Sequence, residues 1–243
     1  MRFGYIIIGL IFIGLTECNS PTNKNQSKDE LTYPNVEIVG AMKNVMWQGR
    51  LGGIIDLDTI STREGLYGLG PLSYLKGEIL INDGKSYVSK VVIDSSMIVE
   101  KTFDVSAPFF VYGRVIDWSV SDVPEEVKTI QNLEEFIDKK TVSNKRPFVF
   151  KLTGRVANAI IHIQNLPEGT QVSSPSEAHQ GQVKYAVKGE TVEIIGFFST
   201  EHKGIFTHHD SFVHMHLITI DEQKMGHLDE LEMEEMKLYL PVK

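Results

Sequence analysis

The sequence predicts an α+β fold that is mostly β, in which a mixed or antiparallel sheet packs against a β-barrel-like half. Two observations predict it. Short apolar runs, bounded by turn residues, recur along most of the chain, as is typical of strands. Only the stretch 124–140 has the spacing of a clear amphipathic helix, with acidic residues in its first turn. Its recurring apolar residues are Val127, Ile130, Leu133 and Ile137.

The expected strands follow one another along the chain, and the first hairpin is the clearest. Residues 77–81 and 86–88 flank Asn82-Asp83-Gly84, and Asp-Gly is a strong signal for a tight turn between two strands. The other expected strands are 36–39, 96–103, 109–117, 148–156, 160–164, 182–188 and 191–198. Short helices are expected at 47–51 and 61–64.

The N-terminal segment is expected to direct export. Arg2 precedes an apolar run, 5–15, that is too short to span a bilayer and has the proportions of a signal peptide. The run ends at Leu15-Thr16-Glu17-Cys18, which resembles a bacterial lipobox, although Glu17 stands where a small residue is expected. We therefore expect Cys18 to carry a lipid. It is the only cysteine, so an intramolecular disulfide is excluded.

The expected organisation is a lipoprotein-type signal peptide (1–17), a polar tether (18–34) and a folded domain (35–243), either undivided or in two subdomains (35–145 and 146–243). The expected location is the periplasmic or cell-surface side of a membrane. Lys and Arg number 24 against 32 Asp and Glu, a formal net charge of -8. Since there is no basic stripe, nucleic acid is excluded as a partner.

Histidines are concentrated near the C-terminus, with six of the eight between positions 202 and 227. His214 and His216 occupy alternate positions of an expected strand and therefore share one face. The polar stretch 221–226 ends in glycine and can turn the chain so that His227 lies alongside. Three neutral imidazoles with an open fourth position suit catalytic zinc. The remaining histidines of this region are interpreted as loop residues or partners of the ligands: His202, His208 and His209.

Glu78 is the other informative residue, because it belongs to a strand that is otherwise apolar. Such a carboxylate is either solvated on an edge face or buried for a purpose, and the sequence leaves both open. A buried carboxylate close to a cation can act as a general acid or base.

Together, these two motifs resemble the alpha-acetolactate decarboxylase family. The resemblance is carried by the segments Gly68-Leu69-Gly70, Leu75-Lys76-Gly77-Glu78, Asp83-Gly84 with Tyr87, His214-Met215-His216 and Gly226-His227. It covers about residues 47–228 and implies a decarboxylase domain over 35–243. It also implies zinc on the three histidines, and Glu78 as the acid/base or proton relay.

Two positions depart from the family's pattern. The family's substrate-binding arginine corresponds to His162, with Arg155 nearby on a different register. Both are candidates for orienting the substrate's carboxylate. The family also has a glutamate near the end of the chain, whereas the last glutamates here are Glu232, Glu234 and Glu235.

The resemblance implies zinc-dependent decarboxylation of 2-acetolactate, a 2-hydroxy-3-oxo acid, to acetoin. Zinc would be a Lewis acid where the enediolate charge develops, with no organic cofactor. Two alternatives remain open: a membrane-tethered zinc-binding or ligand-binding lipoprotein without turnover, and a related metal enzyme with a changed substrate. A homodimer is also left open.

Overall fold

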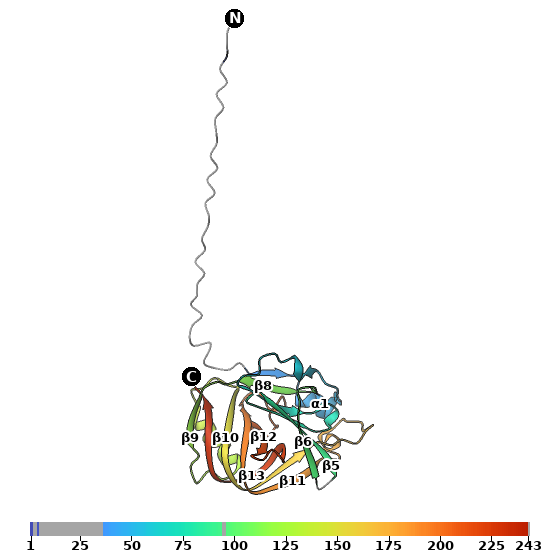
Figure 1. Ribbon diagram of the computed structural model, residues 1–243. Helices are drawn as coiled ribbons and strands as arrows, with labels where there is room; N and C mark the ends of the chain where they lie inside the picture. The colour runs from blue at the N-terminus through green and yellow to red at the C-terminus, as the bar shows by residue number, and fades with distance from the viewer. Residues whose placement is uncertain (2–3, 5–35, 94–95, 243) are drawn as a thin grey trace.

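The computed structural model describes residues 1, 4, 36–93 and 96–242. Cys18, the whole expected tether and all of the expected signal peptide except residues 1 and 4 lie outside these residues. Two large sheets face each other, and their strand pairings are all antiparallel (Figure 1). The expectation of a mostly β fold with few helices is therefore confirmed.

The N-terminal sheet has the strand order β1-β8-β3-β4-β5-β6. Its strands are β1 (Glu37–Val39), β3 (Leu66–Pro71), β4 (Glu78–Asn82), β5 (Lys85–Ile93), β6 (Ser96–Lys101) and β8 (Phe110–Arg114), and the short strands β2 (Ile55–Asp56) and β7 (Ser106–Ala107) pair separately. The predicted hairpin is confirmed between β4 and β5. Asp83 and Gly84 both have positive φ, 47° and 75°, as a two-residue type I′ turn requires.

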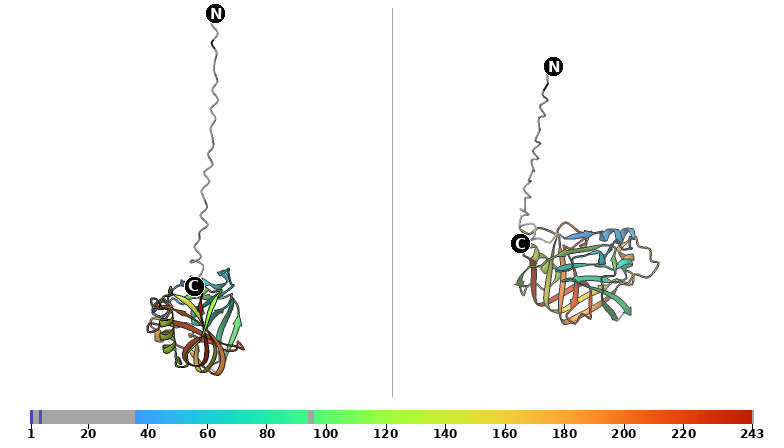
Figure 2. Two further views of the ribbon diagram at one scale, coloured as in Figure 1. Left: turned by 90° about the vertical axis from the view of Figure 1, so that its left-hand side faces the viewer. Right: turned by 45° about the horizontal axis from the view of Figure 1, so that its top comes forward.

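The C-terminal sheet has the order β10-β11-β12-β13-β9, and β10 also pairs with β13. Its strands are β9 (Trp118–Asp122), β10 (Phe148–Ile163), β11 (Val183–Phe198), β12 (Val213–Thr219) and β13 (Met225–Pro241). The long strands curve strongly around one another (Figure 2). The barrel-like half is confirmed only in part: the barrel is not closed, and β9 extends the sheet along β13.

The helices differ from those expected at their ends. The predicted helix 124–140 is α2 (Ile130–Lys140), which begins later because Thr129 caps it by accepting a hydrogen bond from the Asn132 N–H. The helix expected at 47–51 is misplaced: α1 (Met42–Gln48) lies earlier in the chain and is ended by Gly49 at φ 60°. The helix expected at 61–64 is wrong, since that segment is irregular. The remaining helices are η2 (Leu57–Thr59), η3 (Ser73–Leu75) and α3 (Pro175–Ala178). Within the described ranges, no helix has the length and apolar character needed to span a membrane.

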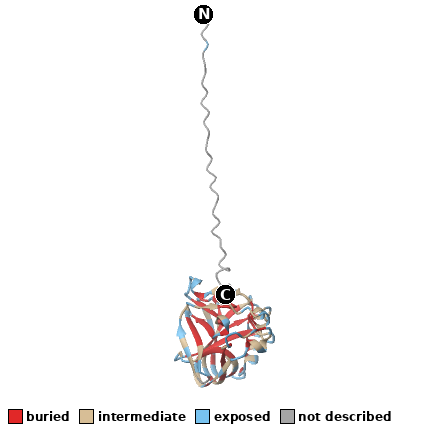
Figure 3. Ribbon diagram, turned by 90° about the vertical axis from the view of Figure 1, so that its right-hand side faces the viewer, coloured by how far each residue is buried: buried red, intermediate tan, exposed pale blue. Residues whose placement is uncertain are grey.

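Strand β12 lies between two cores, and this decides where its histidines point. The odd-numbered residues from 213 to 217 pack with α2 inside the C-terminal sheet. Ile218 belongs instead to a core that includes Leu80 of the N-terminal sheet. His214 and His216 share the face of Ile218, because alternate residues of a strand share a face. The two histidines therefore face the boundary between the sheets, where most of the strand residues are buried (Figure 3).

Candidate metal centre

The three histidines predicted as metal ligands lie together. His214 and His216 come from β12, and His227 comes from the neighbouring β13, where it pairs directly with His216. Their ring centroids are 5.2 Å (His214–His216), 5.0 Å (His214–His227) and 5.5 Å (His216–His227) apart. All three side chains are buried. The strand pairing thus brings the trio together, as the sequence predicted.

The chemistry of this trio fits a metal ion. Four ring nitrogens of the trio are buried with no hydrogen-bond partner among the described residues: Nδ1 of His214, both nitrogens of His216 and Nδ1 of His227. Unsatisfied buried nitrogens are costly, and a metal ion would satisfy one nitrogen of each ring. Burial lowers the pKa of His214 and His216 well below 6.5, and it lowers that of His227 to about 4 with help from the positive charge that His162 can carry. The rings are therefore neutral at pH 7, which is the form that binds metals.

Glu78 reaches the same cluster from the opposite sheet. Its Oε2 lies 3.7 Å from Nε2 of His216, and its Oε1 lies 3.8 Å from Nε2 of His162. The backbone N–H of Gln164 donates a hydrogen bond of 3.3 Å to Oε1. The side chain is buried, which settles the alternative left open by the sequence. Burial raises the pKa of Glu78 well above 4.5, so the carboxyl group holds a proton more tightly than an exposed one does.

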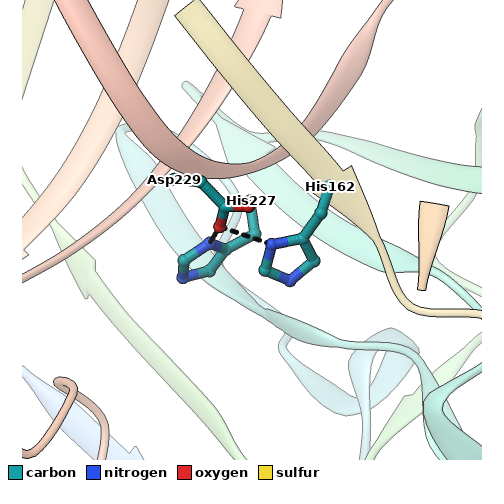
Figure 4. Close-up of side chains that lie close together, drawn as sticks. All are labelled: His162, His227 and Asp229. Carbon is teal, nitrogen blue, oxygen red and sulfur yellow. Dashed lines mark hydrogen bonds and ion pairs between the residues drawn. The ribbon is translucent and has the colours of Figure 1, made fainter. Parts of the chain in front are cut away.

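Asp229 connects two of the histidines (Figure 4). One of its oxygens, Oδ1, lies 2.6 Å from Nδ1 of His162 and 3.3 Å from Nδ1 of His227. Nζ of Lys184 lies 3.1 Å from the other oxygen. Burial alone would raise the pKa of Asp229, but the hydrogen bond with His162 and the nearby ring of His227 outweigh it and hold that pKa below its usual value. We therefore assign the ring protons to Nδ1 of both histidines, which leaves Nε2 of His162 as an acceptor on the side of Glu78.

The sequence reasoning missed Asp229, although the signal was present. His227 and Asp229 are two residues apart on one strand and therefore share a face, as His214 and His216 do. Donor atoms of His162, His227 and Asp229 lie within 4.8 Å of one another, which makes them an alternative grouping that could hold a metal. Asp229 has a short contact to His162, whereas nitrogens of all three clustered histidines, Nδ1 of His227 included, lack a hydrogen-bond partner among the described residues. The described residues thus offer two overlapping candidate groups, which share His227.

Two cavities meet at these histidines. The smaller, about 180 Å³, is lined on one side by apolar residues: Met42, Met46, Trp47, Leu75 and Phe109. The larger, about 430 Å³, is lined by Lys184, Asp229 and other polar groups. Both cavities are bordered by the same five histidines: His162, His179, His208, His214 and His227. A small molecule in either cavity would therefore meet His214 and His227, whereas His216 lines neither cavity.

Comparison with known proteins decides the family. The family model described as alpha-acetolactate decarboxylase matches residues 39–242. The chain belongs to the alpha-acetolactate decarboxylase family. It is 26% identical over 169 residues to the alpha-acetolactate decarboxylase of Lactococcus lactis subsp. cremoris, covering 68% of this chain and 67% of that protein. The chain is therefore an enzyme of the carboxy-lyase class.

Solved structures support the fold assignment. The crystal structure of alpha-acetolactate decarboxylase from Bacillus subtilis superposes with a TM-score of 0.71, at 19% identity, over 86% of this chain and 85% of that one. A protein of unknown function from Staphylococcus aureus, similar to alpha-acetolactate decarboxylase, gives a TM-score of 0.72 at 16% identity, over 86% of this chain and 85% of that one. At these identities the likeness shows the shared fold alone.

The two departures from the alpha-acetolactate decarboxylase pattern have different structural outcomes. His162 lies in the cluster, between Asp229 and Glu78. Arg155 does not: it lies seven residues earlier on β10, roughly 23 Å along an extended strand. Its half-exposed side chain forms an ion pair of 2.8 Å with Glu234. The last glutamates of the chain, Glu232, Glu234 and Glu235, are all exposed, and neither cavity at the cluster is lined by them.

Proposed function

We propose that this chain decarboxylates 2-acetolactate to acetoin at a zinc ion held by His214, His216 and His227. One structural observation supports the proposal in addition to the family membership. A buried carboxyl group, Glu78, comes from one sheet and lies 3.7 Å from a buried histidine of the other sheet that has no hydrogen-bond partner among the described residues. Burying a titratable group beside a metal site is costly for stability, and such groups are typical of active sites.

The reaction needs a place for negative charge and a source of a proton. Zinc, when bound, supplies a Lewis acid that stabilises the charge developing on the ketone oxygen as carbon dioxide leaves. The carbon that loses the carboxylate must then take up a proton. Glu78 is suited to donate it, because burial keeps the carboxyl group protonated to higher pH than usual.

His162 is suited to orient the carboxyl group of Glu78 and to exchange a proton with it. Its Nδ1–H donates to Asp229, which fixes the ring and leaves the lone pair of Nε2 directed toward Glu78 at 3.8 Å. The side-chain amide nitrogen of Gln164 lies 3.5 Å from Nε2 of His162. His162 can therefore accept a proton from the Glu78 side or return one to it, which makes it a relay between Glu78 and the polar cavity that it lines.

The apolar wall of the smaller cavity favours loss of carbon dioxide. Leu75 and Phe109, both buried, line it next to Glu78 and His214. A carboxylate loses hydration there, whereas the carbon dioxide formed from it is neutral and needs none. The cavity of about 180 Å³ is of the size that suits a small acid. A protein that only binds zinc needs neither this wall nor Glu78, so the alternative without turnover is disfavoured.

Incubation with racemic 2-acetolactate tests the proposal. The described domain, loaded with zinc, should produce acetoin and carbon dioxide in equal amounts. Treatment with a chelator should abolish production, and added zinc should restore it. His216→Ala should fold but neither retain zinc nor form acetoin. Full zinc occupancy of the wild type with no acetoin formed would instead favour a changed substrate.

We also propose that the domain is anchored outside the inner membrane through a lipid on Cys18. The proposal is supported by Arg2, the short apolar run and the lone cysteine before a polar stretch. Labelling cells with a fatty-acid probe should mark the wild type, and Cys18→Ser should lose both the label and partition into detergent. Recovery of the native chain with Met1 intact in the cytoplasm would contradict the anchor.

A further inference from the structure

We propose that His208 is a fourth ligand of the metal centre, so that the resting site is closed by four imidazoles. The proposal rests on the three-histidine zinc site proposed above. His208 belongs to the loop between β11 and β12, outside the strands that carry the other ligands. The sequence alone indicates only a loop residue or a partner of the ligands.

The first support is a distance between two ring nitrogens. Nε2 of His208 lies 3.2 Å from Nε2 of His227. Two nitrogens that share a tetrahedral zinc ion at the usual bond length are about 3.3–3.4 Å apart. The two rings therefore have almost the separation of ligands on one ion. The ring of His208 is also edge-on to that of His214, with centroids 6.4 Å apart, so it stands next to two of the three proposed ligands.

The second support is that the loop is held in place. The backbone N–H groups of Met42 and Lys43, at the start of α1, donate to the carbonyls of Ile205 and Gly204 at 2.7 and 3.0 Å. Phe206, two residues before His208, is fully buried. The adjacent His209, in contrast, is exposed. The fold thus brings one of two consecutive histidines into contact with His227, whereas the other is exposed at the edge of the smaller cavity.

The ring protons of His208 and His227 can be placed so that both rings stay neutral with and without the metal. Asp229 lies next to Nδ1 of His227 and so favours a proton there, which leaves the lone pair of His227 Nε2 for the metal. Without metal, Nε2–H of His208 donates to that lone pair. With metal, His208 carries its proton on Nδ1 instead, and its Nε2 lone pair becomes the fourth donor. The ring stays neutral in both states, so no net proton is gained or lost.

This arrangement has a consequence for substrate binding. His208 lines both cavities, as His214 and His227 do, so a small molecule that reaches these two ligands also meets His208. A substrate offering a hydroxyl and a ketone oxygen must therefore displace His208 or raise the coordination number to five, which catalytic zinc sites tolerate. His208 is thus a reversible ligand carried by a tethered loop.

Cobalt(II) substitution tests this without measuring activity. The metal-free wild type is titrated with cobalt(II), and the visible absorption bands report the ligand set. We compare His208→Ala with His209→Ala, a matched control at the adjacent, exposed residue of the same loop, and with His216→Ala. His208→Ala should still bind about one cobalt(II) ion, with roughly 10–100-fold weaker affinity and altered bands. Free imidazole should restore the wild-type bands in His208→Ala, and His209→Ala should match the wild type.

The outcomes separate the two proposals. Identical bands and affinity for the wild type and His208→Ala, together with loss of cobalt(II) from His216→Ala, would overturn the fourth ligand and leave the three-histidine site standing. A wild type that binds no cobalt(II), or a His216→Ala variant that binds it normally, would overturn the three-histidine site itself. Failure of imidazole to restore the bands would show that His208 acts on the centre only through packing.

Discussion

The two sheets contribute to the site in different ways. The C-terminal sheet places His216 and His227 side by side through strand register, so its contribution follows from local pairing. The N-terminal sheet contributes Glu78, which meets the histidines only across the packed boundary between the sheets. The difference indicates that metal binding depends on one sheet, whereas proton transfer depends on how accurately the two sheets pack together. The predictions below test this division, from the largest expected effect to the smallest.

Replacing Glu78 should separate proton transfer from metal binding. Glu78→Gln keeps the shape of the side chain but cannot deliver a proton. We expect normal zinc content and a fall in acetoin formation of about 10²–10⁴-fold, the usual contribution of a general acid or base. Zinc content is measured by elemental analysis and turnover by the acetoin assay.

Glu193→Gln is the matched control for that variant. Glu193 also joins the two sheets, by accepting a hydrogen bond of 2.6 Å from Asn82, but lines neither cavity at the histidines. It should retain most of the turnover. If Glu78→Gln loses its zinc or melts far below Glu193→Gln, then Glu78 supports the fold or the metal and the division between the sheets fails.

Replacing Asp229 should have a smaller effect, within the C-terminal sheet. Asp229→Asn removes the charge that holds the Nδ1 protons of His162 and His227, so both rings can turn or change tautomer. We expect zinc affinity or turnover to fall by roughly 10–100-fold, as for other groups that orient metal ligands. Glu232→Gln makes the same change of charge at an exposed position of the same strand that lines neither cavity, and it should lower neither zinc affinity nor turnover. If the two variants had the same zinc affinity and turnover, Asp229 would not orient His162 and His227.

Acid should destabilise the metal-free domain. Burial lowers the pKa of His208 and His227 from 6.5 to about 4, and it lowers those of His214 and His216 as well. The unfolded chain therefore binds more protons than the folded one between these values. Stability should be complete above about pH 6.5 and be lost as the pH falls toward 4. The pKa of Glu78 is raised, so this group stabilises the folded state as the pH falls. Its single contribution is smaller than the combined loss from the four histidines.

Denaturant unfolding of the metal-free domain at several pH values measures this slope. His208→Ala should flatten it, since one of the contributing groups is gone. A free energy of unfolding that stays constant, or rises, between pH 6.5 and 4.5 would show that these rings are not buried in the neutral form.

Arg155→Ala should have the smallest effect. Arg155 is half exposed and is paired with Glu234 on the surface of the C-terminal sheet. Exposed ion pairs contribute at most about 1 kcal/mol to the free energy of unfolding. Acetoin formation should therefore stay within about twofold of the wild type. A large rise in KM alone would indicate that Arg155 does reach the substrate's carboxylate.

The histidine motif could be predicted from sequence because its geometry is local. Alternation places His214 and His216 on one face, and a short polar turn returns the chain to His227. The β4–β5 hairpin was predictable for the same reason, since Asp83-Gly84 selects one turn type. The approach of Glu78 to these histidines could not be derived from spacing, because it depends on the packing of two separate sheets. Only the family resemblance indicated it.

Strand β13 shows a second limit of sequence reasoning. Its buried apolar residues do not alternate regularly along the chain: Leu228, Leu231, Met233, Met236, Leu238 and Leu240. The register with β10 shifts at several points, and each irregularity changes which residues face the core. Many glutamates lie between the apolar residues, so the segment lacks the pattern of a strand. Its second half, beyond the histidine, was therefore not predicted.

Anomalous diffraction from crystals of the zinc-loaded domain tests the central claim most directly. Our account predicts one strong peak at the zinc edge, with nitrogens of His214, His216 and His227 each about 2.0–2.1 Å away and Glu78 facing the ion without replacing any of them. A peak held instead by His162, His227 and Asp229, or no peak in crystals of a domain that turns over 2-acetolactate, would contradict it.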